Sequence, residues 1–184
     1  MNKKLTLALT LAALPWIAQA HNLTVGQPVP AVKVDDKGEL MLTDGSITYQ
    51  PWSAAQLPGK VRVVQAMAGR SSAKEINGPI IEALKTAGLP KDTYQTTTIV
   101  NQDDAVWGTG GFVKSSVEDS KEEFSWSSFI LDADGKVAKA WDLKAKSNAI
   151  IVLDKSGKVL FAKDGALTEQ EISDVLSMLK TALQ

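Results

Sequence analysis

The chain has 184 residues, of which 20 are Lys or Arg and 21 are Asp or Glu, and it contains no cysteine. This length is typical of one domain, and the near balance of charge argues against nucleic-acid binding, which needs a concentrated basic patch. The absence of cysteine excludes disulfides, dithiol chemistry and thiolate metal ligands.

The first twenty residues have the layout of an export signal. Lys3 and Lys4 precede an uncharged, mostly apolar run, LTLALTLAALPWIA, and AQA then places small residues before His21. The run is shorter than the roughly 20 apolar residues that span a membrane, which favours cleavage over anchoring. We therefore expect removal of residues 1–20 after Ala20. We expect residues 21–184 to form a single soluble domain in the periplasm of a Gram-negative bacterium, with no membrane attachment after cleavage.

The first predicted elements are a hairpin, two strands and a helix. Residues 32–42 alternate apolar and polar side chains around Asp35-Asp36-Lys37-Gly38, which predicts a hairpin turning at those four residues. Residues 47–52 predict a short edge strand, and the β-branched run VRVVQAM, residues 61–67, predicts another strand. The segment SSAKEINGPIIEALKTAG, residues 71–88, predicts a helix.

Capping and breaking signals refine that helix. Ser71 or Ser72 is expected to cap it, with Glu75 close enough to reach back. Gly78-Pro79 is expected to weaken or kink it.

The second half of the chain continues the alternation of strands and helices. YQTTTIVN predicts a strand, residues 112–124 a helix with Phe112 and Val113 inward, and WSSFILD a strand. ADGK is expected to turn the chain so that VAKAW pairs back as a strand. The apolar run AIIVLD predicts a strand buried on both faces, and KVLFAK returns antiparallel to it.

The last helix has the clearest signature in the chain. Thr168 and Glu171 have the spacing of a capping box. An apolar stripe follows at helical spacing and is expected to face the core; it comprises Ile172, Val175, Leu176, Leu179 and Leu183. The complete order of elements predicts an α/β fold, a mixed β-sheet with helices on both faces.

Several segments resemble thioredoxin-like proteins: GQPVP, LPGKVRVV and AIIVLDKSGKV, each in the expected order. More narrowly, GKVRVVQAMAGRSSAKE, YQTTTIVN, FVKSS and AKDGALT are similar to the YtfJ family of exported bacterial proteins. The resemblance covers essentially all of residues 21–184. It implies a thioredoxin-like, periplasmic protein, and it implies no established activity.

The resemblance also locates the position of a redox site. Redox members carry W-C-x-x-C where a strand runs into a helix. Two registers are open here, one placing Gly69 and Ser72 at the cysteine positions and the other placing Ser71 and Lys74 there; both lack sulfur. The place of the family's cis-proline falls at Asn148. Two parts of the redox machinery are therefore missing, and the resemblance implies a redox-silent domain.

Other chemistry has weaker signals. A histidine at the start of a mature chain can chelate Cu(II), but His21 is the one histidine of the sequence, so a second histidine ligand is lacking. No Ser-His-Asp triad is available at this junction. Ser71 or Ser72 with Lys74 could form a nucleophile pair, against the plainer interpretation of capping serines and a solvated lysine.

Two loops complete the candidates. Trp107 lies in the glycine-rich WGTGGFVKSS, which lacks Walker spacing; it would either anchor a partner or fold back onto the core. Turn and cap roles suffice for the aspartates of DADGK and NQDDA.

These observations favour a periplasmic binding or adaptor protein that needs no cofactor. The candidate binding surface comprises Arg70, Ser71, Ser72, Lys74, Trp107 and Asn148. The expected partner is a periplasmic protein, an extended peptide or a small anionic ligand, because a helix N-terminus attracts anions. The alternative is a non-redox hydrolase that uses the serines and Lys74; on balance an enzymatic role is the weaker interpretation.

Overall fold

The computed structural model describes residues 21–184, so the expected leader, residues 1–20, lies outside the described residues. The described chain forms one seven-stranded sheet with four α-helices and a short 3₁₀ helix, Ala54–Gln56. The strands are β1 (Lys33–Thr43), β2 (Ser46–Ser53), β3 (Val61–Ala68), β4 (Tyr94–Asn101), β5 (Ser128–Asp132), β6 (Asn148–Leu153) and β7 (Val159–Asp164). The helices are α1 (Ser71–Thr86), α2 (Gly110–Glu123), α3 (Lys136–Trp141) and α4 (Glu169–Ala182). Within residues 21–184, no helix has the length and apolar character that crossing a bilayer would require.

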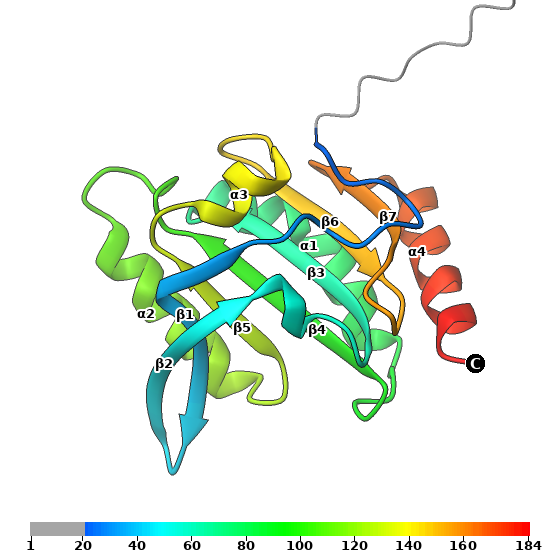
Figure 1. Ribbon diagram of the computed structural model, residues 1–184, viewed down its shortest axis with the longest axis horizontal. Coiled ribbons are helices and arrows are strands. Elements are labelled where there is room, and N and C mark those ends of the chain that lie inside the picture. Colours follow the sequence, from blue (N-terminus) through cyan, green and yellow to red (C-terminus); the bar gives the residue numbers. More distant parts are fainter. Residues whose placement is uncertain (1–20) are drawn as a thin grey trace, which may run out of the picture.

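The sheet is mixed, as the sequence predicts. Its order is β2-β1-β5-β4-β3-β6-β7, with β3, β4 and β5 parallel and the other neighbours antiparallel. The helices α1, α2 and α4 cover one face, whereas α3 and the N-terminal segment cross the other (Figure 1). The carboxyl ends of the parallel strands therefore meet at one edge, where loops from both halves of the chain converge.

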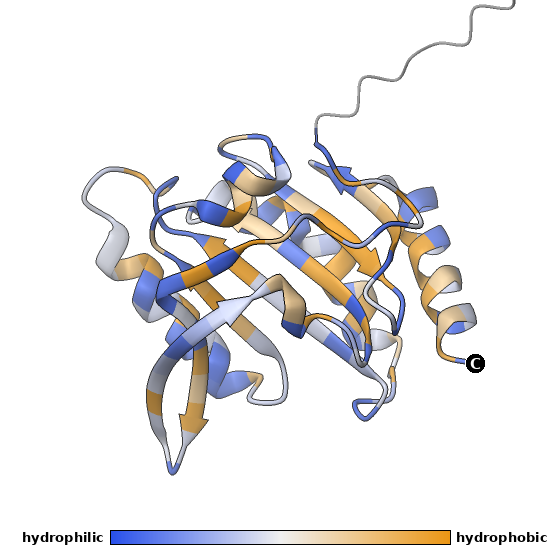
Figure 2. Cartoon of the chain, in the orientation of Figure 1, coloured by the Kyte–Doolittle hydropathy of each residue, from blue (hydrophilic) through white to orange (hydrophobic). Residues whose placement is uncertain are grey.

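The core follows from the alternation of side chains along the central strands. Val64 points into the cluster beneath α3, whereas its neighbour Val63 points into the cluster beneath α1 and α4. All six residues of β6 are buried, which confirms the prediction of a strand covered on both faces. Figure 2 shows apolar residues concentrated along these inner strands. Burial of apolar side chains on both faces stabilises the sheet.

The predicted capping box of the last helix is confirmed. The Glu171 backbone N–H donates to Thr168 Oγ1 at 3.2 Å, and Glu171 Oε2 accepts from the Thr168 backbone N–H at 2.7 Å. Val175 and Leu179 are fully buried, and Ile172 and Leu176 pack beside them. The predicted apolar stripe thus faces the core, and its burial stabilises the docking of α4.

The predicted turn at residues 35–38 is wrong. β1 continues through these residues with a bulge between Val34 and Glu39, and the hairpin turns instead at Asp44-Gly45. Gly38 has a φ of +79°, and a Cβ there would lie 2.1 Å from the carbonyl oxygen of Gln50. Glycine is therefore required at position 38 because two strands approach each other closely there. In the sequence alone, the same residues have the pattern of a turn.

The predicted strand VAKAW is also wrong, because these residues form α3. The carboxylate of Asp132 accepts hydrogen bonds from the backbone N–H groups of Lys136 (3.0 Å) and Val137 (2.8 Å). It thus satisfies donors that are free at the start of a helix. Val137 and Trp141, one helical turn apart, are buried together against the sheet. A cap role, one of the two roles considered for the aspartates of this loop, is thus observed for Asp132, and its hydrogen bonds stabilise the start of α3.

Candidate functional site

The junction between β3 and α1 is anchored by backbone hydrogen bonds to neighbouring strands. The Ala68 N–H donates to the Ser147 carbonyl (2.9 Å), and the Gly69 N–H donates to the Asn101 carbonyl (2.8 Å). A Cβ on Gly69 would lie 3.0 Å from that same Asn101 oxygen and 3.0 Å from a methyl group of Val113. A side chain at Gly69 would therefore be tightly packed and would require its neighbours to shift by a few tenths of an ångström, which favours the register of Ser71 and Lys74.

The serine cap predicted for α1 is wrong. The N-cap residue is Arg70, in an extended conformation with no side-chain cap hydrogen bond. Ser71 and Ser72 are the first helical residues, and both are exposed. The expected reach of Glu75 back to the helix start is likewise absent from the hydrogen bonds of residues 21–184. The first backbone N–H groups of α1 thus remain open to solvent or to a ligand.

The side chain of Arg70 binds the loop between β4 and α2. Its Nε donates to the Asp104 carbonyl at 2.6 Å, and an Nη lies 3.3 Å from Asp104 Oδ1. Asp104 Oδ2 accepts from the Lys146 backbone N–H, and the Asp104 N–H donates to Asn101 Oδ1 at 3.2 Å. Asp104 thereby connects the junction, its own loop and the loop before β6. The Arg70 guanidinium, predicted as a ligand-binding group, is already engaged within the protein.

An apolar tip projects from the same loop and from the first turn of α2. Val106, Trp107 and Phe112 have exposed fractions of 52%, 98% and 79%. The loop beneath them is held by Thr109 Oγ1 to the Val106 carbonyl (2.6 Å) and by Gln102 Nε2 to the Gly110 carbonyl (2.7 Å). Of the two outcomes foreseen for Trp107, the exposed one is observed. The inward orientation predicted for Phe112 is wrong, whereas Val113 packs against the core.

Asn148, predicted to belong to the candidate binding surface, is buried instead. It opens β6 and is 2% exposed, and its Nδ2 donates to Asn77 Oδ1. Asn77 Nδ2 in turn donates to Gln65 Oε1 at 3.3 Å. Asn148 Oδ1 has no hydrogen-bond partner in the described part of the chain. These three residues form a buried chain of side-chain amides across β3, α1 and β6. The sequence indicates it only through Gln65 and Asn77, which are polar residues on otherwise apolar faces.

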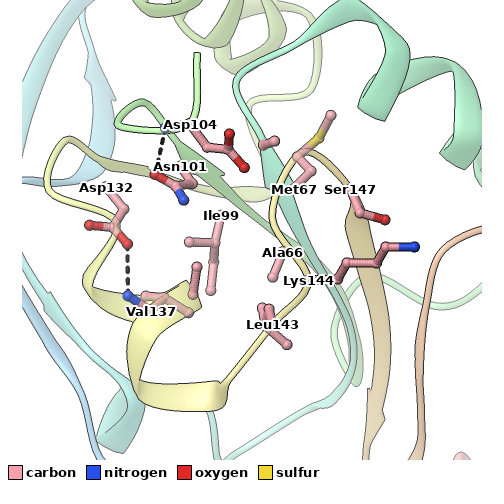
Figure 3. Close-up of a pocket in the computed structure, with 12 residues that line it drawn as sticks. Ala66, Met67, Ile99, Asn101, Asp104, Asp132, Val137, Leu143, Lys144 and Ser147 are labelled. Atoms are coloured by element: carbon pink, nitrogen blue, oxygen red, sulfur yellow. Dashed lines mark hydrogen bonds between the residues drawn. The ribbon is translucent and has the colours of Figure 1, made fainter. Parts of the chain in front are cut away.

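A small cavity lies under the carboxyl ends of the parallel strands (Figure 3). Its volume is about 20 Å³, which is sufficient for one water molecule but not for a substrate. The buried Asp132 lines it together with Asn101 and Ser147. Burial raises the pKa of Asp132, and the backbone N–H groups of Val137 and Lys136 oppose that increase. Since those N–H groups belong to α3, this carboxylate holds the helix start.

The predicted hydrolase groups are not assembled. Ser71, Ser72 and Lys74 are all exposed, and no hydrogen bond joins Lys74 to either serine among residues 21–184. A lysine that serves as a base is normally desolvated and in contact with its nucleophile. This arrangement therefore provides no activated serine.

His21, which the sequence offers as a weak candidate for a copper ligand, is 8% exposed and is therefore packed against the protein. Its Nδ1 accepts a hydrogen bond from the Leu23 backbone N–H at 3.3 Å. No group of three or more His, Cys, Asp or Glu residues suited to holding a metal occurs in the part of the chain that the structure describes. A copper site would therefore depend on His21 without a cluster of side-chain ligands around it.

The sheet order and the strand-to-helix junction define a thioredoxin-like protein without redox cysteines. A DsbF homologue from Corynebacterium diphtheriae has a TM-score of 0.55 and 18% identity, covering 92% of this chain and 96% of its own. The thioredoxin-like superfamily protein SPOA0173 has a TM-score of 0.56 and 18% identity, covering 84% and 96%. At such identities the likeness shows the fold alone. The peptide bonds of residues 21–184 are all trans, so no cis-proline precedes β6.

The chain belongs to the family described as "Bacterial protein of unknown function (YtfJ_HI0045)", whose model matches residues 23–182. It is 50% identical over 184 residues to the uncharacterized protein YtfJ of Escherichia coli K12, covering both chains completely. It is 47% identical over 160 residues to an uncharacterized protein of Haemophilus influenzae, covering 87% of each chain. These findings confirm the family resemblance and the thioredoxin-like fold.

Proposed function

We propose that the chain is exported to the periplasm, and that residues 21–184 act as a redox-silent module that binds an extended segment of a protein partner. Its binding region, here called the junction surface, comprises Arg70, Ser71, Ser72, Lys74, Val106, Trp107 and Phe112. The observation that carries the proposal is Trp107, which is 98% exposed on a loop whose base is held in place.

The apolar and polar parts of the junction surface are neighbours. Arg70 at the start of α1 contacts Asp104 in the loop that carries Trp107. Gly69 likewise lies against Val113 in the first turn of α2. An extended segment could therefore contact the aromatic tip and the open N–H groups of α1 together. Aromatic side chains on a fixed support are the residues that most often dominate binding free energy.

The chemistry of the surface indicates which segment it would accept. Exposed Trp107 and Phe112 favour an apolar or aromatic side chain. The uncapped start of α1, with exposed Lys74 at the end of its first turn, favours a carboxylate. The proposed ligand is thus an extended peptide segment that presents an apolar anchor and an acidic group.

Site-specific photo-crosslinking in living cells tests the binding site. A photoreactive amino acid at position 107 is compared with one at position 25, because Val25 is also apolar and is 61% exposed outside the junction surface. A partner captured at position 107 and absent at position 25 is then made as a peptide for affinity measurement. Trp107→Ala should weaken its binding by about 30-fold, the effect of losing a hot-spot side chain, while Val25→Ala leaves it unchanged. Equal capture at both positions, or unchanged binding by Trp107→Ala, refutes the site.

Export and cleavage have a separate test. The leader pattern of residues 1–20 supports them. Osmotic-shock fractionation followed by intact-mass measurement should find a periplasmic chain that starts at His21. A chain of full-length mass in the cytoplasmic fraction contradicts export, whatever the result for the junction surface.

A further inference from the structure

The carboxylate of Asp164, at the end of β7, has an unusual environment. Both of its oxygens are buried, and neither has a hydrogen-bond partner within residues 21–184. The strand around it is fixed, because Asp164 pairs with Ala149 and the Gly165 N–H donates to the Asn148 carbonyl at 2.7 Å. A buried carboxylate without hydrogen bonds or a counter-ion destabilises a fold unless it is protonated or paired.

The charges that face this carboxylate are those of His21, Lys144 and Asp142. Burial raises the pKa of Asp164, and His21 is the largest opposing influence. Lys144 lowers the pKa of Asp164 less than His21 does, through its backbone N–H and its charge, while Asp142 raises that pKa. No side-chain ion pair among the described residues includes Asp164.

The N-terminal segment is fixed beside the same strand end. Asn22 donates from its backbone N–H to the Trp141 carbonyl (3.2 Å) and from Nδ2 to the Ala140 carbonyl (3.0 Å). Leu23 is 1% exposed, and His21 is 8% exposed. The described chain begins next to the end of β7 (Figure 1). The backbone of His21 is therefore held near Asp164 by the contacts of its neighbours.

We infer that Asp164 is the binding site for the α-ammonium group of His21 in the processed chain. The inference rests on the cleavage after Ala20 that forms part of the proposed function. Hydrolysis of the Ala20–His21 peptide bond consumes one water, leaves a carboxylate on Ala20 and releases an amine on His21, which takes up a proton. That ammonium supplies three N–H donors and a positive charge to a buried carboxylate that has no hydrogen bond and no ion pair among the described residues. Processing would thus complete an ion pair that locks the N-terminal segment onto β7.

The α-ammonium fits this role better than the imidazole of the same residue. The His21 Nδ1 is occupied as an acceptor of the Leu23 N–H. His21→Ala removes the imidazole but keeps the terminal ammonium. It is therefore a matched control that separates the two groups.

The test compares purified chains with defined N-termini, one starting at His21 and one retaining Ala20, each with Asp164 or with Asp164→Asn. Removing a fusion partner with a protease that leaves no extra residue produces either start, so the comparison is independent of processing in the cell. At pH 7 the chain starting at His21 should melt at least about 3 °C higher than the extended chain. Asp164→Asn should abolish the difference, and His21→Ala should retain it.

The pH dependence has a defined sign. An ammonium paired with a carboxylate has a raised pKa, so the extra stability is complete below the ordinary amine value of about 8 and is lost as pH rises through the raised value. It is also lost at acid pH, as Asp164 becomes protonated. Equal melting temperatures for the two N-termini at pH 7, or a difference that survives Asp164→Asn, overturn the inference.

A second measurement needs no variant, so it remains decisive if Asp164→Asn fails to fold. The His21 amine of the folded chain should react with an amine-acylating reagent at pH 7 at least about tenfold more slowly than the amine of the peptide His-Asn-Leu-Thr, because one unit of increase in pKa lowers the free amine tenfold. Equal rates overturn the inference. Intact mass of the exported protein reports separately whether cleavage after Ala20 occurs, and neither result depends on the junction surface.

Discussion

Arg70 and Asp104, 34 positions apart, connect the junction between β3 and α1 to the loop between β4 and α2. The guanidinium contacts both the backbone carbonyl (2.6 Å) and the carboxylate (3.3 Å) of Asp104. The second carboxylate oxygen also accepts from the backbone of Lys146. The arrangement fixes the orientation of the loop that carries Trp107. Substitutions of its two residues should therefore lower the stability of the protein.

Asp104→Ala should destabilise the protein more than Arg70→Ala does. The aspartate accepts from two loops and the arginine contacts only one, so we expect losses of about 2 kcal/mol and about 1 kcal/mol, the latter reduced by solvent screening. Urea unfolding measures both. Lys139→Ala is the control, because its ion pair with Asp103 is exposed (68% and 58%) and should contribute little. Equal effects of the three variants would show that the connection has no special role.

The buried amide chain predicts that a single truncation within it lowers the stability of the protein strongly. Asn77→Ala leaves the side chains of Gln65 and Asn148 without their partners in an apolar interior, and should cost about 2–4 kcal/mol. Glu75→Ala, an exposed position on the same helix, should change stability by less than about 0.5 kcal/mol. Thermal unfolding of the two variants distinguishes them. A loss below 1 kcal/mol for Asn77→Ala would mean that the amides are readily rehydrated.

The two tyrosines predict an alkaline transition. Burial raises the pKa of Tyr94 to about 12, and the pKa of Tyr49 is raised by burial and by its hydrogen bond to Glu118. A tyrosine in the unfolded chain ionises near 10. Because the folded state retains these protons, their contribution to stability is complete below about pH 10 and is lost as pH rises from about 10 to 12.

Absorbance at 295 nm after a rapid pH jump measures this transition, since the chain has only two tyrosines. At pH 11 the folded protein should show little tyrosinate at first, with a slower increase as it unfolds. Immediate ionisation of both residues at pH 11, while tryptophan fluorescence still reports the folded state, would contradict the burial of Tyr94.

The exposed serines predict an absence of labelling. Neither Ser71 nor Ser72 has a hydrogen bond to Lys74, so a fluorophosphonate probe should label the protein no faster than a Ser71→Ala, Ser72→Ala double variant. Gel fluorescence or mass spectrometry detects the adduct. Stoichiometric labelling of the wild type and none of the double variant would instead support the hydrolase alternative.

A D-x-x-G motif, typical of a turn, occurs at Asp35, Asp132 and Asp154, and its three outcomes show what the sequence could and could not predict of the fold. At Asp154 it forms the predicted hairpin turn, with Asp154 Oδ1 accepting from the Ser156 and Lys158 N–H groups. At Asp35 it lies in a bulge, and at Asp132 it precedes a helix. The first outcome is decided by local hydrogen bonds. The bulge depends on the close approach of Gln50 from the partner strand, and the helix depends on the packing of Trp141, whose Nε1 donates to the Pro30 carbonyl 111 positions away.

The candidate site was predictable to a similar extent. The junction at residues 69–74 lies where the sequence placed it, because the apolar strand and the helix that follows have strong local patterns. The partner of Arg70 was not predicted, because Asp104 follows a different strand. The carboxyl ends of β3 and β4 lie at one edge of the sheet, and this adjacency is visible only once the strand order is known.

The close packing around Gly69 has a consequence for any attempt to restore thiol chemistry. A cysteine at this position would place its Cβ against a backbone oxygen of β4 and a methyl group of α2, both at 3.0 Å. The Val113 side chain and the backbone at Asn101 would have to shift by a few tenths of an ångström to accommodate it. A thiol in the Gly69 register would therefore meet two tight contacts, and a side-chain substitution at Val113 could relieve only one of them, because the other is with a backbone oxygen.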